Sequence, residues 1–275
     1  MQALDSLAAG EWRHLRGVFT DIDDTLTTEG AITADALQAL ADLDAAGLTV
    51  IAITGRPVGW CAPFALAWPL RSIVAENGAV ALSRPEVDKE NGLQRLPDKR
   101  GQLSKLYQTD AATRATHRAR LQQVAARVLR EVPGATQARD SAGRETDIAI
   151  DHSEFAHLDQ AAIDQVVAIM RSEGLNATVS SIHINGWIGE HNKWQGAQWI
   201  VRTLLGRELA HEVDQWLFVG DSSNDELMFE HFPQSVGVAN IARFAPHMRH
   251  LPRYVAQQPR GAGFAEAARA LLADR

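Results

Sequence analysis

The chain has 275 residues, of which 45% are hydrophobic and 22% are charged, and its formal net charge is −7. This length allows one or two domains, and the composition is ordinary for a globular protein with a sizeable core. The acidic balance argues against a general nucleic-acid-binding protein. A single cysteine, Cys61, excludes an internal disulfide framework and fits a reducing compartment.

The sequence gives no sign of a membrane segment. It has no run of about 18 apolar residues, so we expect no membrane-spanning helix and no membrane partner. Residues 1–17 lack a basic segment followed by an apolar core, which argues against a secretory signal. We therefore expect a cytoplasmic protein.

The first third of the chain has the pattern of a parallel sheet. Residues 17–20, 48–55 and 71–75 are short apolar runs, and each predicts a buried strand. Between the first two runs, Thr33 and Gly47 bracket an amphipathic stretch that predicts a helix. Strands that alternate with helices are typical of a parallel sheet covered on both faces.

The pattern changes after residue 83. Residues 84–101 are rich in Pro, Gly and charge, which predicts a loop. Helices are predicted near 110–131 and 159–173, and polar and apolar residues alternate at 146–151 and 178–185, which predicts two strands. Two helices between alternating strands indicate an α+β insert, with one face of its sheet open to water or substrate.

The first pattern then resumes. Residues 196–206 predict a helix, 216–219 a buried strand, 236–238 a short strand, and the end of the chain a last helix. The fold class is therefore α/β. A split parallel-sheet domain spans about 1–83 and 190–275 and encloses an inserted domain of about 84–189.

An acidic cluster follows the first predicted strand, in the stretch Phe-Thr-Asp-Ile-Asp-Asp-Thr at 19–25. It is not an EF-hand, because the sixth and twelfth positions counted from Asp21 hold Leu26 and Ile32 instead of Gly and Glu. Two interpretations remain open. The cluster is either a solvated acidic turn or a catalytic carboxylate pair at a strand end.

The catalytic interpretation gives each carboxylate a role. Side chains two positions apart on an extended strand share a face, so Asp21 and Asp23 would point into one site while Asp24 points away. One carboxylate would attack phosphorus and form an aspartyl-phosphate. The other would protonate the leaving oxygen and later activate water.

Later elements supply the other groups that phosphoryl transfer needs. Thr54, at the end of the second strand, offers a hydroxyl and backbone amides, and Lys193 offers a cation. Asp221 and Asp225 flank a turn after the strand at 216–219 and offer oxygen ligands for Mg²⁺. In open α/β sheets, ligands bind at the ends of strands, so these residues are expected to converge.

In this order, the motifs resemble those of the haloacid dehalogenase (HAD)-like phosphatase superfamily. The matching stretches are Asp21-Ile-Asp-Asp-Thr25 (DxDxT), Thr54-Gly-Arg56, Lys193 and Gly220-Asp-Ser-Ser-Asn-Asp225 (GDxxND). The stretch Glu76-Asn-Gly-Ala is similar to a feature of the Cof-like, type IIB branch. That branch carries its cap between the second and third motifs, where the insert at 84–189 lies.

The resemblance implies a Rossmann-like core and an α/β cap. Asp21 would be the nucleophile and Asp23 the general acid and base. Mg²⁺ would be held by the carboxylates of Asp21 and Asp221 and by the backbone carbonyl of Asp23. P-type ATPases of the same superfamily carry Thr at the position of Asp23, so the aspartate implies a phosphatase and not a pump.

The remaining motif residues would support these groups. Thr54, Gly55 and Lys193 would bind the transferring phosphoryl group. Asn224 and Asp225 would support the metal and orient Lys193.

The cap is expected to close over the site and contact the leaving group. The candidate substrate contacts are the polar cap residues Arg144, Asp147, His183 and Asn185. Arg144 would suit a substrate carboxylate or a second phosphate. The relatives to compare first are the mannosyl-phosphoglycerate, sucrose-phosphate and trehalose-phosphate phosphatases.

The expected function is Mg²⁺-dependent hydrolysis of a small phosphorylated metabolite, a phosphorylated sugar or sugar acid. Two alternatives stay open: a phosphomutase acting on a sugar phosphate, and a binding protein that keeps the fold without turnover.

Overall fold

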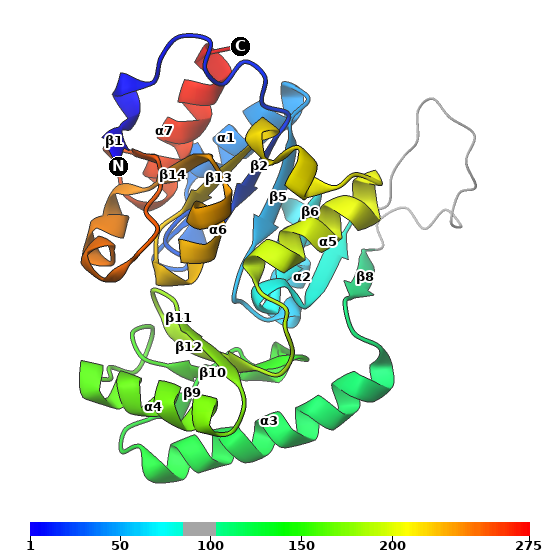
Figure 1. Ribbon diagram of the computed structural model, residues 1–275, viewed down its shortest axis with the longest axis vertical. Helices are drawn as coiled ribbons and strands as arrows, with labels where there is room; N and C mark the ends of the chain where they lie inside the picture. Colours follow the sequence, from blue (N-terminus) through cyan, green and yellow to red (C-terminus); the bar gives the residue numbers. More distant parts are fainter. Residues whose placement is uncertain (85–102) are drawn as a thin grey trace.

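The computed structural model describes residues 1–84 and 103–275. The larger part of the molecule, called the core below, is built around a nine-stranded sheet (Figure 1). In sheet order the strands are β1 (Gln2–Ala3), β15 (Tyr254–Val255), β14 (Gln234–Gly237), β13 (Trp216–Gly220), β2 (Gly17–Thr20), β5 (Thr49–Ile53), β6 (Ser72–Ala75), β7 (Val80–Ser83) and β8 (Ser104–Tyr107). The first seven strands of this order pair in parallel, and β7 and β8 complete one edge as antiparallel strands.

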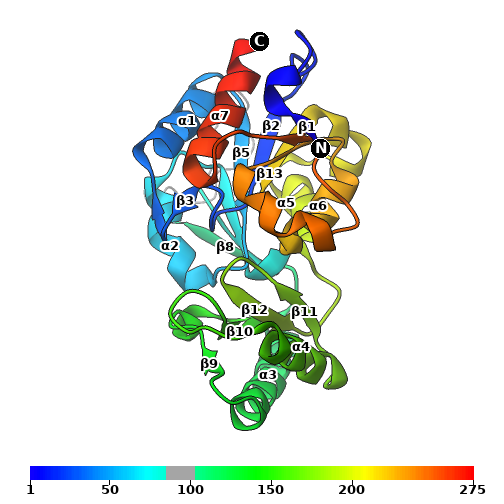
Figure 2. The ribbon, with the colours of Figure 1, turned by 90° about the vertical axis from the view of Figure 1, so that its left-hand side faces the viewer.

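Helices cover both faces of this sheet, as the sequence predicted (Figures 1 and 2). One face carries α1 (Ala34–Ala45), α2 (Val58–Ala67) and α7 (Arg260–Ala273), and the other carries α5 (Lys193–Leu205) and α6 (Glu226–His231). Burial of two apolar layers against the central strands drives this arrangement. A small hairpin, β3 (Thr27–Thr28) and β4 (Ala31–Ile32), follows the acidic cluster.

A second sheet lies at the carboxyl ends of the central strands and forms the cap (Figure 1). Its strands, in order, are β11 (Asn176–Val179), β12 (His183–Trp187), β10 (Asp147–Asp151) and β9 (Thr136–Gln137), all antiparallel. Helices α3 (Ala111–Glu131) and α4 (Gln160–Ser172) pack on the side away from the core. Alternation in β10 and β12 turns Ile148, Ile150 and Ile184 toward these helices and polar residues toward the core.

Two details of the insert differ from the expectations, and a third prediction falls almost entirely outside the described residues. The strand predicted at 178–185 is a hairpin of β11 and β12, because Ser180 turns the chain and its hydroxyl accepts the backbone N–H of His183 at 3.0 Å. Strand β8 lies within the expected insert of 84–189 but pairs with β7 in the large sheet. The loop predicted at 84–101 lies, apart from Arg84, outside the described residues.

One face of the cap sheet was expected to be open to water or substrate. Instead, every residue of β10 and β12 is buried, because this face packs against the core. Across the described parts of the chain, no helix is long and apolar enough to cross a membrane.

Candidate active site

Three neighbouring strand ends bring the predicted core residues together. β2 lies between β13 and β5, with Thr20 opposite Val219 on one side and Ala52 on the other. Asp21, Asp221 and Thr54 follow these strands directly and therefore lie at the same edge of the sheet. The N–H of Asp21 still donates to the carbonyl of Val219 at 2.9 Å, which fixes the backbone at the start of the acidic stretch.

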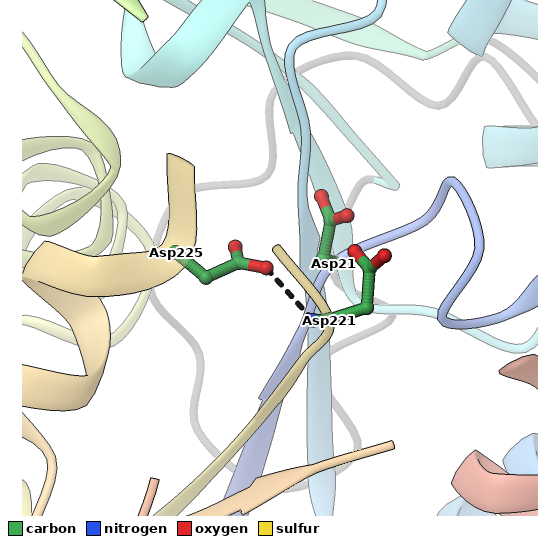
Figure 3. A group of neighbouring side chains, drawn as sticks. All are labelled: Asp21, Asp221 and Asp225. Carbon is green, nitrogen blue, oxygen red and sulfur yellow. Dashed lines mark hydrogen bonds between the residues drawn. The ribbon is translucent and has the colours of Figure 1, made fainter. Parts of the chain in front are cut away.

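The acidic side chains converge at this edge (Figure 3). Carboxylate oxygens of Asp21, Asp221 and Asp225 lie within 4.8 Å of one another, and all three residues are buried. Asp225 Oδ2 accepts the backbone N–H of Asp221 at 2.9 Å, and Lys193 Nζ donates to Asp21 Oδ1 and Asp225 Oδ1, both at 2.7 Å. Residues more than 200 positions apart thus share one buried cluster.

The cluster is short of positive charge. Burial raises the pKa of Asp21 to about 8, Asp225 and Asp23 add to the rise, and Lys193 opposes it. Burial, together with Asp21 and Asp225, also raises the pKa of Asp221 well above its usual range. Burial alone would lower the pKa of Lys193, but the carboxylates of Asp21 and Asp225 outweigh it and raise that pKa. A further cation would relieve the repulsion among these carboxylates.

The donor set fits a hard divalent cation such as Mg²⁺, which prefers carboxylate, carbonyl and water oxygens. Asp21 and Asp221 present adjacent carboxylates, and the amide of Asn240 donates to Asp221 Oδ2 at 2.9 Å and orients it. Both oxygens of Asp225 already accept hydrogen bonds, from Lys193 and from two backbone N–H groups. Asp225 is therefore better suited to hold Lys193 and the turn than to bind the ion directly.

Thr54 and Gly55 form the next part of the site. Thr54 is fully buried, and its hydroxyl oxygen accepts the N–H of Arg56 at 3.0 Å, so the hydroxyl hydrogen can be donated elsewhere. The carbonyl of Gly55 faces the cap and accepts from Arg144 at 2.9 Å and Asn185 at 3.3 Å. A Cβ at Gly55 would lie 3.2 Å from Asn185 Oδ1, so glycine lets the cap approach closely.

Arg56 is a site residue to which the sequence reasoning gave no role. Its Nε donates to both oxygens of Asp23 at 3.0 Å, and it also pairs with the cap carboxylates Asp140 at 3.0 Å and Glu154 at 2.7 Å. The sequence feature that could have identified Arg56 as a site residue is its position, because it directly follows Thr54 and Gly55 at a strand end. Asp140 and Glu154 lie on cap loops and have no comparable signal.

The predicted cap residues separate into two groups. Arg144 donates to both oxygens of Asp147 at 2.9 and 2.8 Å, and Asn185 donates to Asp147 Oδ2 at 3.0 Å, so these three form one buried group beside Gly55. Burial raises the pKa of Asp147 to about 7, and Arg144 opposes the rise. His183 instead lies at a hydrogen-bond distance of 2.9 Å from Glu154, next to Arg56.

The side chains of Asn224 and Asp24 make their contacts with residues outside the buried cluster of Asp21, Asp221 and Asp225. Asn224 accepts a hydrogen bond from the hydroxyl of Ser222 at 2.9 Å and so stabilises the turn itself. Asp24 pairs with Arg260 on α7 at 3.0 Å. The structure thus brings together the carboxylates of Asp21, Asp221 and Asp225. The side chains of Asn224 and Asp24 contact Ser222 and Arg260 instead.

Glu76, in the stretch Glu-Asn-Gly-Ala, joins the core to the cap. Its buried carboxylate accepts the N–H of Val58 at 3.0 Å within the core. It also accepts the N–H groups of Glu145 at 3.1 Å and Thr146 at 2.6 Å from the cap. Since a buried carboxylate needs such donors, this contact holds the two parts together beside the site.

Comparisons with known proteins bear on the sequence family and the fold. Residues 18–113 match the model of the haloacid dehalogenase-like hydrolase family. No curated protein sequence matches the chain. Among solved structures, protein 0175 of Thermoplasma acidophilum aligns with a TM-score of 0.68 at 16% identity over 94% of this chain and 98% of that one.

Two further structures have comparable similarity. The sucrose-phosphatase of Synechocystis sp. PCC6803, solved with sucrose and phosphate, aligns with a TM-score of 0.63 at 16% identity over 94% of this chain and 98% of that one. A putative HAD/Cof-like hydrolase of Plasmodium vivax aligns with a TM-score of 0.63 at 16% identity over 95% and 97%. The predicted resemblance is confirmed: residues 18–113 carry the sequence pattern of the haloacid dehalogenase-like hydrolases, and the chain has their fold.

Proposed function

We propose that the protein hydrolyses a small phosphate monoester through an aspartyl-phosphate formed on Asp21. The observation that carries this proposal is the buried carboxylate cluster at the strand ends, in which Lys193 donates to Asp21 Oδ1 at 2.7 Å. A fixed, water-poor carboxylate beside a lysine suits nucleophilic attack on a phosphoryl group. The cost of burying this cluster argues against a protein that keeps the fold without turnover.

The metal that this proposal requires is Mg²⁺, which the carboxylates of Asp21 and Asp221 and the backbone carbonyl of Asp23 would hold. When bound, Mg²⁺ would neutralise the charge of both the phosphoryl group and the attacking carboxylate. Asn240 would keep Asp221 oriented through its 2.9 Å hydrogen bond.

The residues of the chain divide the reaction into two steps. In the first, an oxygen of Asp21 bonds to phosphorus, the bond between phosphorus and the leaving oxygen breaks, and Asp23 gives that oxygen a proton. In the second, water loses a proton to Asp23 and attacks phosphorus, the bond to Asp21 breaks, and phosphate leaves. Thr54 and Lys193 would donate hydrogen bonds to the phosphoryl oxygens throughout.

The substrate class we propose is a phosphorylated sugar or sugar acid. The core-facing side of the cap carries buried polar groups, Asp147, His183 and Asn185, of the kind that bind hydroxyl groups. The structural likeness to a sucrose-phosphatase is consistent with this class. Arg144 is already paired with Asp147 and would have to exchange that partner to bind a substrate carboxylate.

The test is phosphate release from a panel of sugar phosphates and from para-nitrophenyl phosphate, with Mg²⁺ present. The wild-type protein should release phosphate without forming an isomerised sugar phosphate, which would identify a phosphomutase. Asp21→Asn should abolish release, because the amide cannot form the aspartyl-phosphate. Unchanged turnover in Asp21→Asn would reject the mechanism, and a wild-type protein without turnover on the whole panel would reject the function.

A further inference from the structure

The guanidinium of Arg56 is enclosed on three edges by carboxylates of the core and the cap. The edge formed by Nε and Nη2 faces Asp23, with three contacts of 2.9 to 3.0 Å. Nη2 and Nη1 face Glu154 at 2.7 and 3.4 Å, and Nη1 also reaches Asp140 at 3.0 Å. One face of the group lies 4.8 Å from the ring centre of Trp60, so the guanidinium is fixed in position and orientation.

The two cap carboxylates are themselves fixed by other cap residues. Asp140 accepts a second hydrogen bond from Arg144 at 3.2 Å, and Glu154 lies 2.9 Å from His183 Nε2. The backbone N–H of Glu154 donates to Asp151 at 2.9 Å. Burial would raise the pKa of Glu154, but hydrogen bonds from His183 and Arg56 lower it to about 2.

We propose that Glu154 and Asp140 are positioning residues that align Asp23 through Arg56 when the cap rests on the core. The inference rests on the proposed function, in which Asp23 transfers the proton. Arg56 provides two donors to Asp23, and each of its other edges is held by a group whose place the cap determines. Without those groups, the guanidinium of Arg56 could rotate and carry the Asp23 carboxylate with it. Proton transfer is sensitive to a misplacement of the transferring carboxyl group by about 1 Å.

The proposal predicts a dependence on the leaving group. Protonation of the leaving oxygen matters most when the departing anion is unstable, and least when it is stable without a proton. Misalignment of Asp23 should therefore slow phenyl phosphate much more than para-nitrophenyl phosphate. A variant that merely weakened the fold, the cap contact or metal binding would slow both esters by the same factor.

The test compares kcat/KM for the two esters in wild type, Glu154→Gln and the control Glu173→Gln. Glu173 is also a cap glutamate paired with arginine, and its side chain is 19% exposed, as is that of Glu154. Its partners Arg120 and Arg127 lie on α3 and not in the core. In Glu154→Gln, kcat/KM should fall about tenfold more for phenyl phosphate than for para-nitrophenyl phosphate, and Asp140→Asn should shift the ratio in the same direction.

Each outcome separates this inference from the proposed function. If wild type turns over both esters and the ratio of the two rates is unchanged in Glu154→Gln, the positioning role is wrong although the function stands. The same holds if Glu173→Gln shifts the ratio as much as Glu154→Gln does. If wild type turns over neither ester and none of the sugar phosphates of the panel, the proposed function fails and the inference fails with it.

Discussion

The core site and the cap face that covers it differ in how their buried carboxylates are partnered. In the core, three buried carboxylates gather around Lys193. On the cap face, each of the carboxylates Asp140, Asp147 and Glu154 contacts an arginine, either Arg144 or Arg56. In the core, by contrast, Asp221 accepts only from neutral groups among the described residues, the amide of Asn240 and the hydroxyl of Thr25.

This difference indicates which side has to bind a charged ligand. Buried charges are tolerated when they are paired or coordinate a metal, so a core carboxylate without an arginine or lysine partner is expected where a cation is bound. The cap carboxylates that contact arginine can be buried without a ligand. Changes in the core should therefore alter metal binding and turnover most, and changes in the cap, apart from those at Asp140 and Glu154, should mainly alter stability.

The largest effect is expected for Asp221→Asn, which removes one of the two proposed carboxylate ligands. Turnover should fall about 10³-fold, because the metal supplies several kcal/mol of charge stabilisation in the transition state. Mg²⁺ should also no longer raise the melting temperature, as measured by thermal denaturation over a Mg²⁺ titration. Asp42→Asn, an exposed change on α1, is the control. An equal Mg²⁺ effect in wild type and Asp221→Asn would contradict the proposed metal site.

The next effect concerns the cation of the core cluster. Lys193→Met leaves Asp21 and Asp225 buried without their partner, which should lower the free energy of unfolding by about 3–5 kcal/mol. The matched control is Lys105→Met, because Lys105 also lies 2.7 Å from a carboxylate, Glu145, but is 41% exposed. That change should cost less than about 1 kcal/mol. The free energy of unfolding is measured by urea denaturation. An equal loss in Lys193→Met and Lys105→Met would show that burial does not strengthen the contacts of Lys193 with Asp21 and Asp225.

The core site could be predicted from the sequence because its residues follow buried strands. Apolar runs locate the strands, and the polar residue after each run then lies at one edge of the parallel sheet, which places Asp21, Thr54 and Asp221 together. Asn240, which follows β14 and contacts Asp221, could have been found by the same rule. Lys193 directly follows no strand, so this rule does not place it; it was proposed as the cation of the site, and the resemblance gave it the phosphoryl-binding role.

The cap side of the junction could not be predicted in this way. Asp140 and Glu154 lie on loops, and their approach to Arg56 depends on how the cap sheet packs on the core, which no local pattern encodes. The alternation of β10 and β12 was recognised, but not that the core covers their polar face. Alternation of polar and apolar residues shows that a strand has two different faces, but it does not identify what packs against each face.

A smaller effect is expected where a cap carboxylate supports only the backbone. Asp151 accepts N–H groups from Ser153, Glu154, Phe155 and Ala156, so it shapes the loop that carries Glu154. Asp151→Asn turns one acceptor into a donor facing N–H groups, which should cost about 1–3 kcal/mol in free energy of unfolding.

The control for this change is Asp159→Asn at the start of α4. Asp159 accepts one backbone N–H, from Ala162 at 2.8 Å, and Asn is an equally good N-cap, so stability should hardly change. Both variants are measured by urea denaturation. Asp151→Asn with the stability of wild type would show that the loop does not depend on this carboxylate.

The smallest effect is a pH dependence from His191, in the connection that returns from the cap to the core. Burial lowers the pKa of His191 from 6.5 to about 4, with a smaller contribution from His117. The folded state therefore keeps the ring neutral, so the stabilisation is complete above pH 6.5 and is lost as the pH falls from 6.5 toward 4. The first unit below pH 6.5 should cost about 1 kcal/mol. In His191→Gln, which cannot take up this proton, stability measured by denaturation at several pH values should fall less steeply over that range. An unchanged slope would mean that His191 binds a proton as readily in the folded protein as in the unfolded chain.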